Sequence, residues 1–206
     1  MTRVRVKICG LTRPEDVDAA VAEGADALGF VFTPRSKRAL HMQRAVELVA
    51  RVPAFVSRVG LFMDQEPEVV AEVLDRVPLS LLQFHGAEPA GFCRQFGLPY
   101  IKAVSMDSSE SVKRAEDEYH DSAGLLLDSH PVGGVGGTGE VFEWSIIPAT
   151  HVPLILAGGL VPENVGQAVR QVRPWAVDVS SGVEDAPGIK NSELMRKFIK
   201  EAKREY

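Results

Sequence analysis

The sequence is poor in the features that mark secreted, membrane-spanning and nucleic-acid-binding proteins. It contains only two cysteines among 206 residues, so it has no disulfide framework. No apolar run approaches the ~20 residues that a helix needs to cross a membrane. Acidic residues outnumber basic ones by 28 to 23, and the net charge of −5 argues against binding to nucleic acid, whose phosphate backbone requires a basic face.

The first residues also lack the pattern of a secretion signal. Residues 1–8 mix charged and apolar side chains, as a strand does, and contain no continuous apolar core. We therefore expect a cytoplasmic protein in which each cysteine is a free thiol that needs its own explanation. Cys93 lies in an amphipathic run, where we expect it to pack on the inner side of a helix.

What the chain does have is a regular alternation of short apolar runs with longer amphipathic runs. The apolar runs are rich in Val, Ile, Leu and Phe, which is typical of strands that are buried on both faces of a parallel sheet. They cover residues 4–9, 27–32, 58–63, 79–85, 100–105, 124–129, 153–158 and 176–181.

Runs with helical periodicity separate these predicted strands. Several begin with proline, which suits the first turn of a helix. Thr12, with Glu15 three positions later, is predicted to cap the first helix. The predicted helices cover residues 14–23, 42–51, 67–75, 89–95, 110–120, 144–150, 162–172 and 192–203.

Eight strands that alternate with eight helices predict right-handed βαβ units and a parallel sheet. Such a sheet can close into a barrel or stay open and doubly wound. No Gly-x-Gly-x-x-Gly motif follows the first strand, which disfavours the open nucleotide-binding form. Since no linker or change of composition is visible, we predict one α/β domain over residues 1–206, a (β/α)8 TIM barrel.

The predicted loops after strands seven and eight carry a candidate phosphate site. Gly158-Gly159 follows the seventh strand and Ser180-Ser181 ends the eighth. Glycine lets backbone amides approach a phosphate closely, and serine hydroxyls add donors. Either pair alone would suit an ordinary turn. Together, at the two strand ends where barrels frequently bind phosphate, they predict a phosphate site.

Two further strand ends carry a candidate acid–base pair. Cys9 ends the first strand and Asp128 the sixth, and side-chain alternation directs both toward the barrel mouth. Each alone has an ordinary alternative, a small buried apolar residue for the cysteine and a turn residue for the aspartate. Lys7 and Asp178 are predicted to pair inside the barrel, where the cation would also favour the thiolate of Cys9.

Longer motifs run in order through nearly the whole chain. They are Lys-Ile-Cys-Gly-Leu-Thr at 7–12, Gly-Ala-Asp-Ala-Leu-Gly-Phe-Val-Phe at 24–32, Ser-Lys-Arg at 36–38, Leu-Gln-Phe-His-Gly at 82–86, Leu-Asp at 127–128, Gly-Gly-Thr-Gly at 136–139, Ala-Gly-Gly-Leu at 157–160, Pro-Glu-Asn-Val at 162–165 and Val-Asp-Val-Ser-Ser-Gly-Val-Glu at 177–184. In this order they resemble the phosphoribosylanthranilate isomerase family, and the first and last motifs are the most specific.

The resemblance implies an isomerase of tryptophan biosynthesis. Its reaction would be the Amadori rearrangement of N-(5-phosphoribosyl)anthranilate to 1-(2-carboxyphenylamino)-1-deoxyribulose 5-phosphate. The family's general base matches Cys9 and its general acid matches Asp128, which would have to be protonated near neutral pH. Arg38 matches the arginine that binds the anthranilate carboxylate, and His85 matches a histidine close to the substrate. The remaining expected substrate-binding residues are Gly158, Gly159, Asp178, Ser180 and Ser181.

The resemblance implies no metal and no organic cofactor, because the iminium intermediate is itself an electron sink. The expected partner is a small phosphorylated ribosyl-anthranilate, with no nucleic acid and no membrane. A monomer and a homodimer are both compatible with the sequence. The glycine-rich stretch 130–139 is predicted to be a mobile loop that can cover the substrate.

Three alternatives compete with this interpretation. A metal-dependent sugar-phosphate epimerase would need several His and Asp ligands at strand ends, where only His85 among five histidines lies. The related Amadori isomerase of histidine biosynthesis uses two aspartates and a substrate with two phosphates, whereas this chain offers Cys9 and one phosphate site. A non-catalytic phosphate-binding barrel would not need Cys9, Asp128 and Arg38 together.

Overall fold

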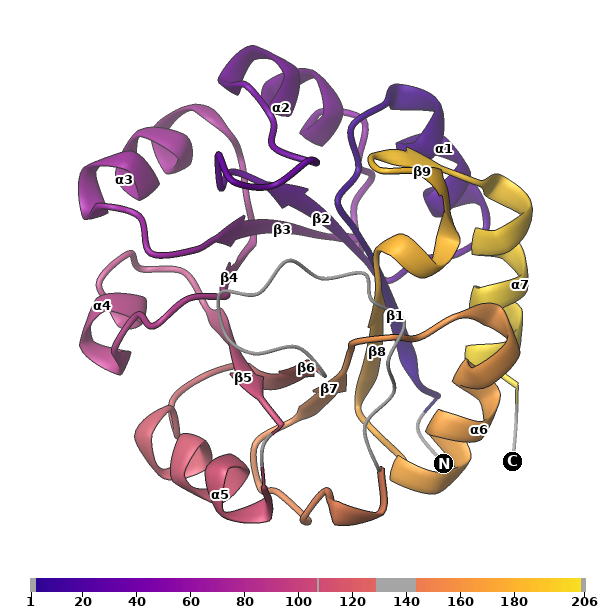
Figure 1. Cartoon of the computed structure of the whole chain (residues 1–206). Coiled ribbons are helices and arrows are strands. Elements are labelled where there is room, and N and C mark those ends of the chain that lie inside the picture. Colours follow the sequence, from indigo (N-terminus) through magenta and orange to yellow (C-terminus); the bar gives the residue numbers. More distant parts are fainter. Residues whose placement is uncertain (1–2, 107, 129–143, 205–206) are drawn as a thin grey trace.

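Eight parallel strands form a closed barrel in the computed structural model, which describes residues 3–106, 108–128 and 144–204 (Figure 1). Each strand pairs with its neighbour in chain order, and the first strand closes the barrel on the eighth. The strands are β1 (Arg5–Cys9), β2 (Ala27–Val31), β3 (Ser57–Phe62), β4 (Leu81–Phe84), β5 (Tyr100–Ser105), β6 (Gly124–Asp128), β7 (Leu154–Leu156) and β8 (Ala176–Val179).

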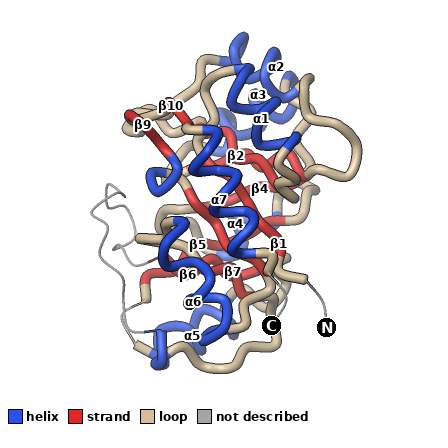
Figure 2. Tube along the Cα trace, turned by 90° about the vertical axis from the view of Figure 1, so that its right-hand side faces the viewer, coloured by secondary structure: helices blue, strands red, loops and turns tan. Residues whose placement is uncertain are grey.

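Helices surround the barrel wall, as the views along and across its axis show (Figures 1 and 2). They are α1 (Pro14–Ala22), α2 (Met42–Val49), α3 (Pro67–Arg76), α4 (Ala90–Arg94), α5 (Ser109–Glu118), α6 (Pro162–Val172) and α7 (Ser192–Ala202). Two short 3₁₀ helices, η1 (Trp144–Ile146) and η2 (Ser181–Val183), and a small antiparallel pair, β9 (Glu184–Ala186) with β10 (Ile189–Lys190), complete the described elements. The predicted (β/α)8 barrel is therefore confirmed.

Two local predictions are wrong. The helix expected over 144–150 is only the short η1, because Pro148 lacks an amide hydrogen and disfavours helical backbone at Ile147. Thr12 does not cap α1: the N-cap position is Arg13, and the Thr12 hydroxyl instead donates a hydrogen bond to the carbonyl of Gly188, 2.5 Å away. The predicted mobile loop at 130–139 lies outside the described residues.

The strands are buried on both faces, as their continuous apolar runs predict. In β6, Leu126 belongs to a cluster of side chains inside the barrel, whereas Leu125 and Leu127 pack on the helical side. The inside cluster consists of Ile101, Ala103, Leu126, Ile155, Ala157 and Ala176. Within the described ranges, no helix is both long and apolar enough to cross a membrane.

Adjacent valines on α3 give a matched test of this packing. Val70 is fully buried, whereas Val69 is 42% exposed. Val70→Ala removes two buried methyl groups and leaves a cavity, so we expect it to lower the free energy of unfolding by about 2 kcal/mol. Val69→Ala should change it by less than about 0.5 kcal/mol. Urea unfolding of both variants checks the difference, and equal losses would contradict this packing of α3.

Candidate active site

A cavity of about 510 Å³ opens at the C-terminal ends of the barrel strands. Side chains from β1, β4, β6 and β8 and from the loops after β2 and β8 line it. The predicted site residues that it brings together are Cys9, Arg38, His85, Asp128, Asp178, Ser180 and Ser181. Gly158 and Gly159 lie beyond the end of β7 and do not line this cavity.

Cys9 is the last residue of β1, and its side chain faces the cavity while the residue is only 4% exposed. Its thiol lies against Gly29 of the neighbouring strand β2, with which it pairs. A Cβ atom at position 29 would come within 2.6 Å of the Cys9 sulfur, closer than real contacts allow. Gly29 therefore provides the space in which the thiol lies.

Burial is the largest influence on the Cys9 thiol, and it raises the pKa above the ordinary value of 9.0. Lys7 acts in the opposite direction and Asp178 in the same direction as burial. The prediction that Lys7 favours the thiolate is correct in sign, but the effect of the cation is smaller than that of burial. Burial therefore favours the neutral thiol of Cys9 over the thiolate.

Lys7 and Asp178 form the predicted ion pair across the β1–β8 seam. Their register places them side by side, and the Nζ atom of Lys7 lies 2.8 Å from Oδ1 of Asp178. Both side chains are less than one-tenth exposed. Burial lowers the pKa of Lys7, but the charges and hydrogen bonds of Asp178 and Cys9 together outweigh it, so the net shift is upward. The pair keeps two charges in the barrel interior directly beneath Cys9.

His85 lies between Asp128 and Gln83 in the wall of the cavity. Its Nε2 atom lies 3.5 Å from Oδ2 of Asp128, and its Nδ1 atom lies 3.1 Å from the side-chain nitrogen of Gln83. Gln83 is fully buried in β4. Contacts on both sides of the imidazole thus fix the orientation of the ring toward Asp128. Gln83 was not predicted from the sequence, although its position two residues before His85, on the same face of the strand, is the signal that indicates it.

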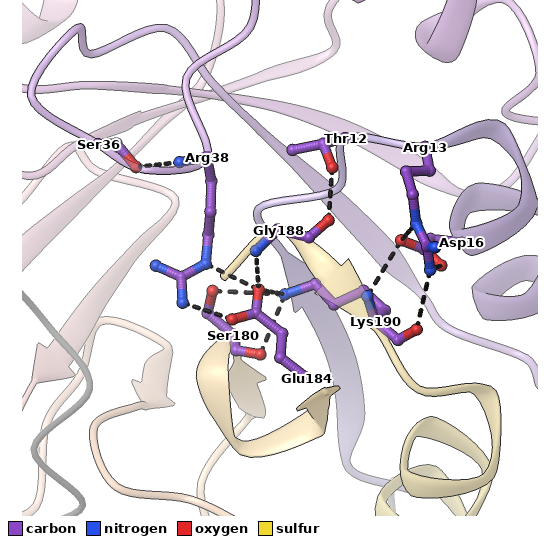
Figure 3. A network of polar contacts seen from close by, with 9 residues as sticks. All are labelled: Thr12, Arg13, Asp16, Ser36, Arg38, Ser180, Glu184, Gly188 and Lys190. Carbon is purple, nitrogen blue, oxygen red and sulfur yellow. Dashed lines mark hydrogen bonds and ion pairs between the residues drawn. The ribbon is translucent and has the colours of Figure 1, made fainter. Parts of the chain in front are cut away.

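Arg38 extends from the loop after β2 across the end of β1. The backbone of Gly10 has a φ of +78°, and any Cβ there would overlap the Arg38 side chain. The guanidinium is not free, because Nε donates to Oε1 of Glu184 at 2.8 Å and Nη2 donates to Oε2 at 2.5 Å (Figure 3). The sequence predicts Arg38 at the site, whereas no role was predicted for Glu184.

Lys190, on β10, contacts the same carboxylate. Its Nζ lies 2.7 Å from Oε1 of Glu184 and donates to the carbonyl of Ser180 at 3.0 Å, while its side chain is fully buried (Figure 3). Burial raises the pKa of Glu184, but the hydrogen bonds and charges of Arg38 and Lys190 more than offset it, so the net shift is downward. Glu184 is therefore ionised between two cations.

The loops after β7 and β8 pack closely together. A Cβ at Gly182 would overlap the carbonyl of Leu160, so the β8 loop can approach the β7 loop only with glycine there. Gly158 and Gly159 have φ values of +78° and +62°, which favour glycine. Within the described ranges, the amides of these two glycines donate no hydrogen bond to protein. The side-chain nitrogen of Asn164 holds the loop through the carbonyl of Gly159 at 2.9 Å.

In residues 3–106, 108–128 and 144–204, no group of three or more His, Cys, Asp or Glu side chains is arranged to hold a metal ion. The chemistry that the described site offers is therefore that of a thiol, a carboxyl group and a carboxylate-paired arginine around one cavity.

The chain is similar to known proteins over nearly its whole length. A family model described as N-(5'phosphoribosyl)anthranilate (PRA) isomerase matches residues 6–201. The N-(5'-phosphoribosyl)anthranilate isomerase of Pseudomonas fluorescens is 52% identical, over 97% of this chain and 98% of the relative. The enzyme of that name from Dechloromonas aromatica is 51% identical, over 96% and 95%.

Solved structures give the same result. Phosphoribosyl anthranilate isomerase from Thermotoga maritima superposes with a TM-score of 0.87 at 42% identity, covering 97% of this chain and 98% of its own. A phosphoribosyl anthranilate isomerase in complex with reduced 1-(o-carboxyphenylamino)-1-deoxyribulose 5-phosphate has a TM-score of 0.83, with the same identity and coverage. Another structure shows monomers generated from the dimeric Thermotoga maritima enzyme.

The raised pKa of the Cys9 thiol can be measured directly. Because burial outweighs the nearby cation, the ultraviolet absorbance of the Cys9 thiolate should appear with a midpoint above 9.0 in a Cys93→Ala background. Lys7→Met removes the cation and should move the midpoint further upward. A midpoint below 9.0, or a downward shift in the Lys7 variant, would contradict the electrostatics described above.

Gly29→Ala tests the space around the thiol. The added methyl group would press on the Cys9 sulfur, so the thiol has to move away from its position in the cavity. In a Cys93→Ala background we expect alkylation of Cys9 by iodoacetamide to slow by more than about tenfold, because a reacting atom displaced by about 1 Å reacts much more slowly. Gly91→Ala, where a Cβ would meet nothing within 4 Å, is the control and should leave the alkylation rate unchanged.

Proposed function

The chain belongs to the N-(5'-phosphoribosyl)anthranilate isomerase family, and from this premise we propose that it catalyses the Amadori rearrangement of N-(5-phosphoribosyl)anthranilate with Cys9 as general base and Asp128 as general acid. The observation that carries the proposal is the convergence of these two side chains. They come from β1 and β6, which are far apart in the sequence, and they line one cavity. That cavity also holds Arg38 and His85.

The substrate has two anionic ends, and the proposed site offers a cationic or donor group for each. The phosphate would bind at the loops after β7 and β8, where the amides of Gly158 and Gly159 and the hydroxyls of Ser180 and Ser181 are donors. The anthranilate carboxylate would bind Arg38. This orientation places the ribose ring between the two ends, within reach of the acid and the base.

In the first step, Asp128 would donate a proton to the furanose ring oxygen. The C1–O bond then breaks, and the electron pair of the anthranilate nitrogen forms an iminium ion. Asp128 would have to be protonated when substrate binds, and desolvation by the bound substrate favours that neutral form. His85, held by Gln83 and directed toward Asp128, would keep the carboxyl group in place.

In the second step, the Cys9 thiolate would remove the proton from C2, and the electrons of that bond would neutralise the iminium. The resulting enolamine tautomerises to the ketone. The same burial that makes the thiolate scarce also makes it a stronger base, because basicity rises with the pKa of the conjugate acid. Asp178 remains a proposed substrate contact as well as the partner of Lys7.

Substitution of the two proposed catalytic groups tests this assignment. Cys9→Ala and Asp128→Asn each remove a proton-transfer group, so kcat should fall by roughly 10²- to 10⁴-fold. Both should still bind the reduced product analogue, because neither group is needed for binding. Cys93→Ala is the matched control, since Cys93 is buried in α4 away from the cavity. The assay follows the fluorescence of phosphoribosylanthranilate, and losses below tenfold would contradict the roles.

A chelator separates this mechanism from that of a metal-dependent epimerase. The iminium ion accepts the electrons in the proposed reaction, so no metal is required. We expect turnover to be the same before and after dialysis against EDTA. Loss of activity that returns with an added divalent metal would favour the epimerase-type mechanism instead.

A further inference from the structure

Glu184 and Lys190 occupy the site without a part in the proton transfers. Glu184 is only slightly exposed, and both guanidinium contacts of Arg38 go to its two carboxylate oxygens. A guanidinium has five N–H donors in one plane. The contacts with Glu184 use Nε and one hydrogen of Nη2. The other edge, formed by Nη1 and the second hydrogen of Nη2, makes no contact with Glu184. Figure 3 shows Nη1 directed away from Glu184.

That remaining edge has the geometry that a carboxylate requires. Two parallel N–H groups on one edge of a guanidinium match the two oxygens of a carboxylate. Arg38 lines the cavity, and its side chain is 17% exposed, so the edge is reachable for a ligand. A flexible arginine would have to be immobilised at each binding event, and the two bonds to Glu184 remove most of that cost in advance.

Lys190 supplies the net positive charge that the Arg38–Glu184 pair lacks. Arg38 and Glu184 alone would form a neutral pair with little attraction for an anion. Lys190 adds a positive charge 2.7 Å from the same carboxylate, so the three groups together carry one net positive charge. Since all three are largely buried, this charge is poorly screened by solvent.

The short β9–β10 pair that carries both residues is fixed to the barrel. The backbone nitrogen of Lys190 donates to Oδ2 of Asp16 at 3.1 Å, and its carbonyl accepts from Nη2 of Arg13, also at 3.1 Å (Figure 3). Thr12 adds its bond to the carbonyl of Gly188. The loop after β1 and the first turn of α1 therefore fix the β9–β10 pair, and its Glu184 in turn orients Arg38.

We propose that Glu184 and Lys190 are positioning residues that make the site specific for a substrate carboxylate, Glu184 by fixing the orientation of Arg38 and Lys190 by preserving its positive charge. The proposal rests on the proposed function, in which Arg38 binds the anthranilate carboxylate. It assigns the preference for a carboxylate-bearing ring to three side chains instead of one.

Two variants separate geometry from charge. Glu184→Gln removes the two-point contact. Because Glu184→Gln takes away a negative charge, it does not reduce the net positive charge, so a loss of carboxylate preference in this variant reports the lost orientation of Arg38. Lys190→Met keeps the contact between Arg38 and Glu184 but removes the net positive charge. Asp26→Asn, just before β2 and at the opposite end of the barrel, is the control for loss of a partly buried carboxylate.

The experiment compares two ligands on each protein by titration. One is reduced 1-(o-carboxyphenylamino)-1-deoxyribulose 5-phosphate, and the other is the same compound with an unsubstituted phenyl ring. In the wild type and in Asp26→Asn, the carboxylate ligand should bind about 10- to 100-fold more tightly, as expected for hydrogen bonds to a charged group. Glu184→Gln and Lys190→Met should each reduce that preference by about tenfold and leave the Kd of the phenyl ligand within about twofold.

The preference is a ratio measured on one folded protein, so partial loss of stability in a variant does not affect it. Turnover adds a second readout: Glu184→Gln should raise KM for phosphoribosylanthranilate with kcat within about threefold, the pattern expected when only binding is lost. Equal weakening of both ligands, or an unchanged preference in both variants, would overturn the proposal. If the wild type turns over the substrate, either result leaves the proposed function standing; if it does not, both proposals fail.

Discussion

The pairing of the first strand with the last is the constraint on which the site depends. Closure in the register Lys7 to Asp178 brings two ends of the chain together and places a buried cation beside a buried anion. It also brings Cys9, at the end of β1, next to the loop after β8 that contains Ser180. A sheet left open at this seam would leave Lys7 without its partner and would separate the thiol from the proposed phosphate site.

The site concentrates charge in a poorly solvated place, and each buried charge has a partner. Lys7 pairs with Asp178, and Lys190 pairs with Glu184, which also holds Arg38. Such pairs contribute little net stability compared with apolar packing, because desolvation offsets most of their attraction. Their value here is geometric, since they hold functional groups in fixed orientations around one cavity. Glycines supply the complementary space at positions 10 and 29.

Much of the fold and part of the candidate site could be predicted from the sequence. The barrel is predictable because its strands are local runs of apolar residues with helical segments between them. Since barrel sites lie at strand ends, that position is enough to select Cys9 and Asp128 as candidate site residues. The Arg38–Glu184–Lys190 group could not be found in this way. Lys190 lies on a strand of two residues, and only the tertiary position of β9 and β10 brings it to the site. The strength of burial at Cys9 likewise depends on the packing of several strands, so the sign of its pKa shift could not be read from neighbouring residues.

The central proposal assigns the two proton transfers to different residues: Asp128 would open the ring and Cys9 would remove the proton from C2. The most direct test is the kinetic isotope effect on kcat with phosphoribosylanthranilate deuterated at C2. In Cys9→Ser, proton removal becomes the slow step, so a large primary isotope effect should appear. In Asp128→Asn, ring opening becomes the slow step, so the effect should nearly vanish. A large effect in Asp128→Asn together with none in Cys9→Ser would contradict the assignment.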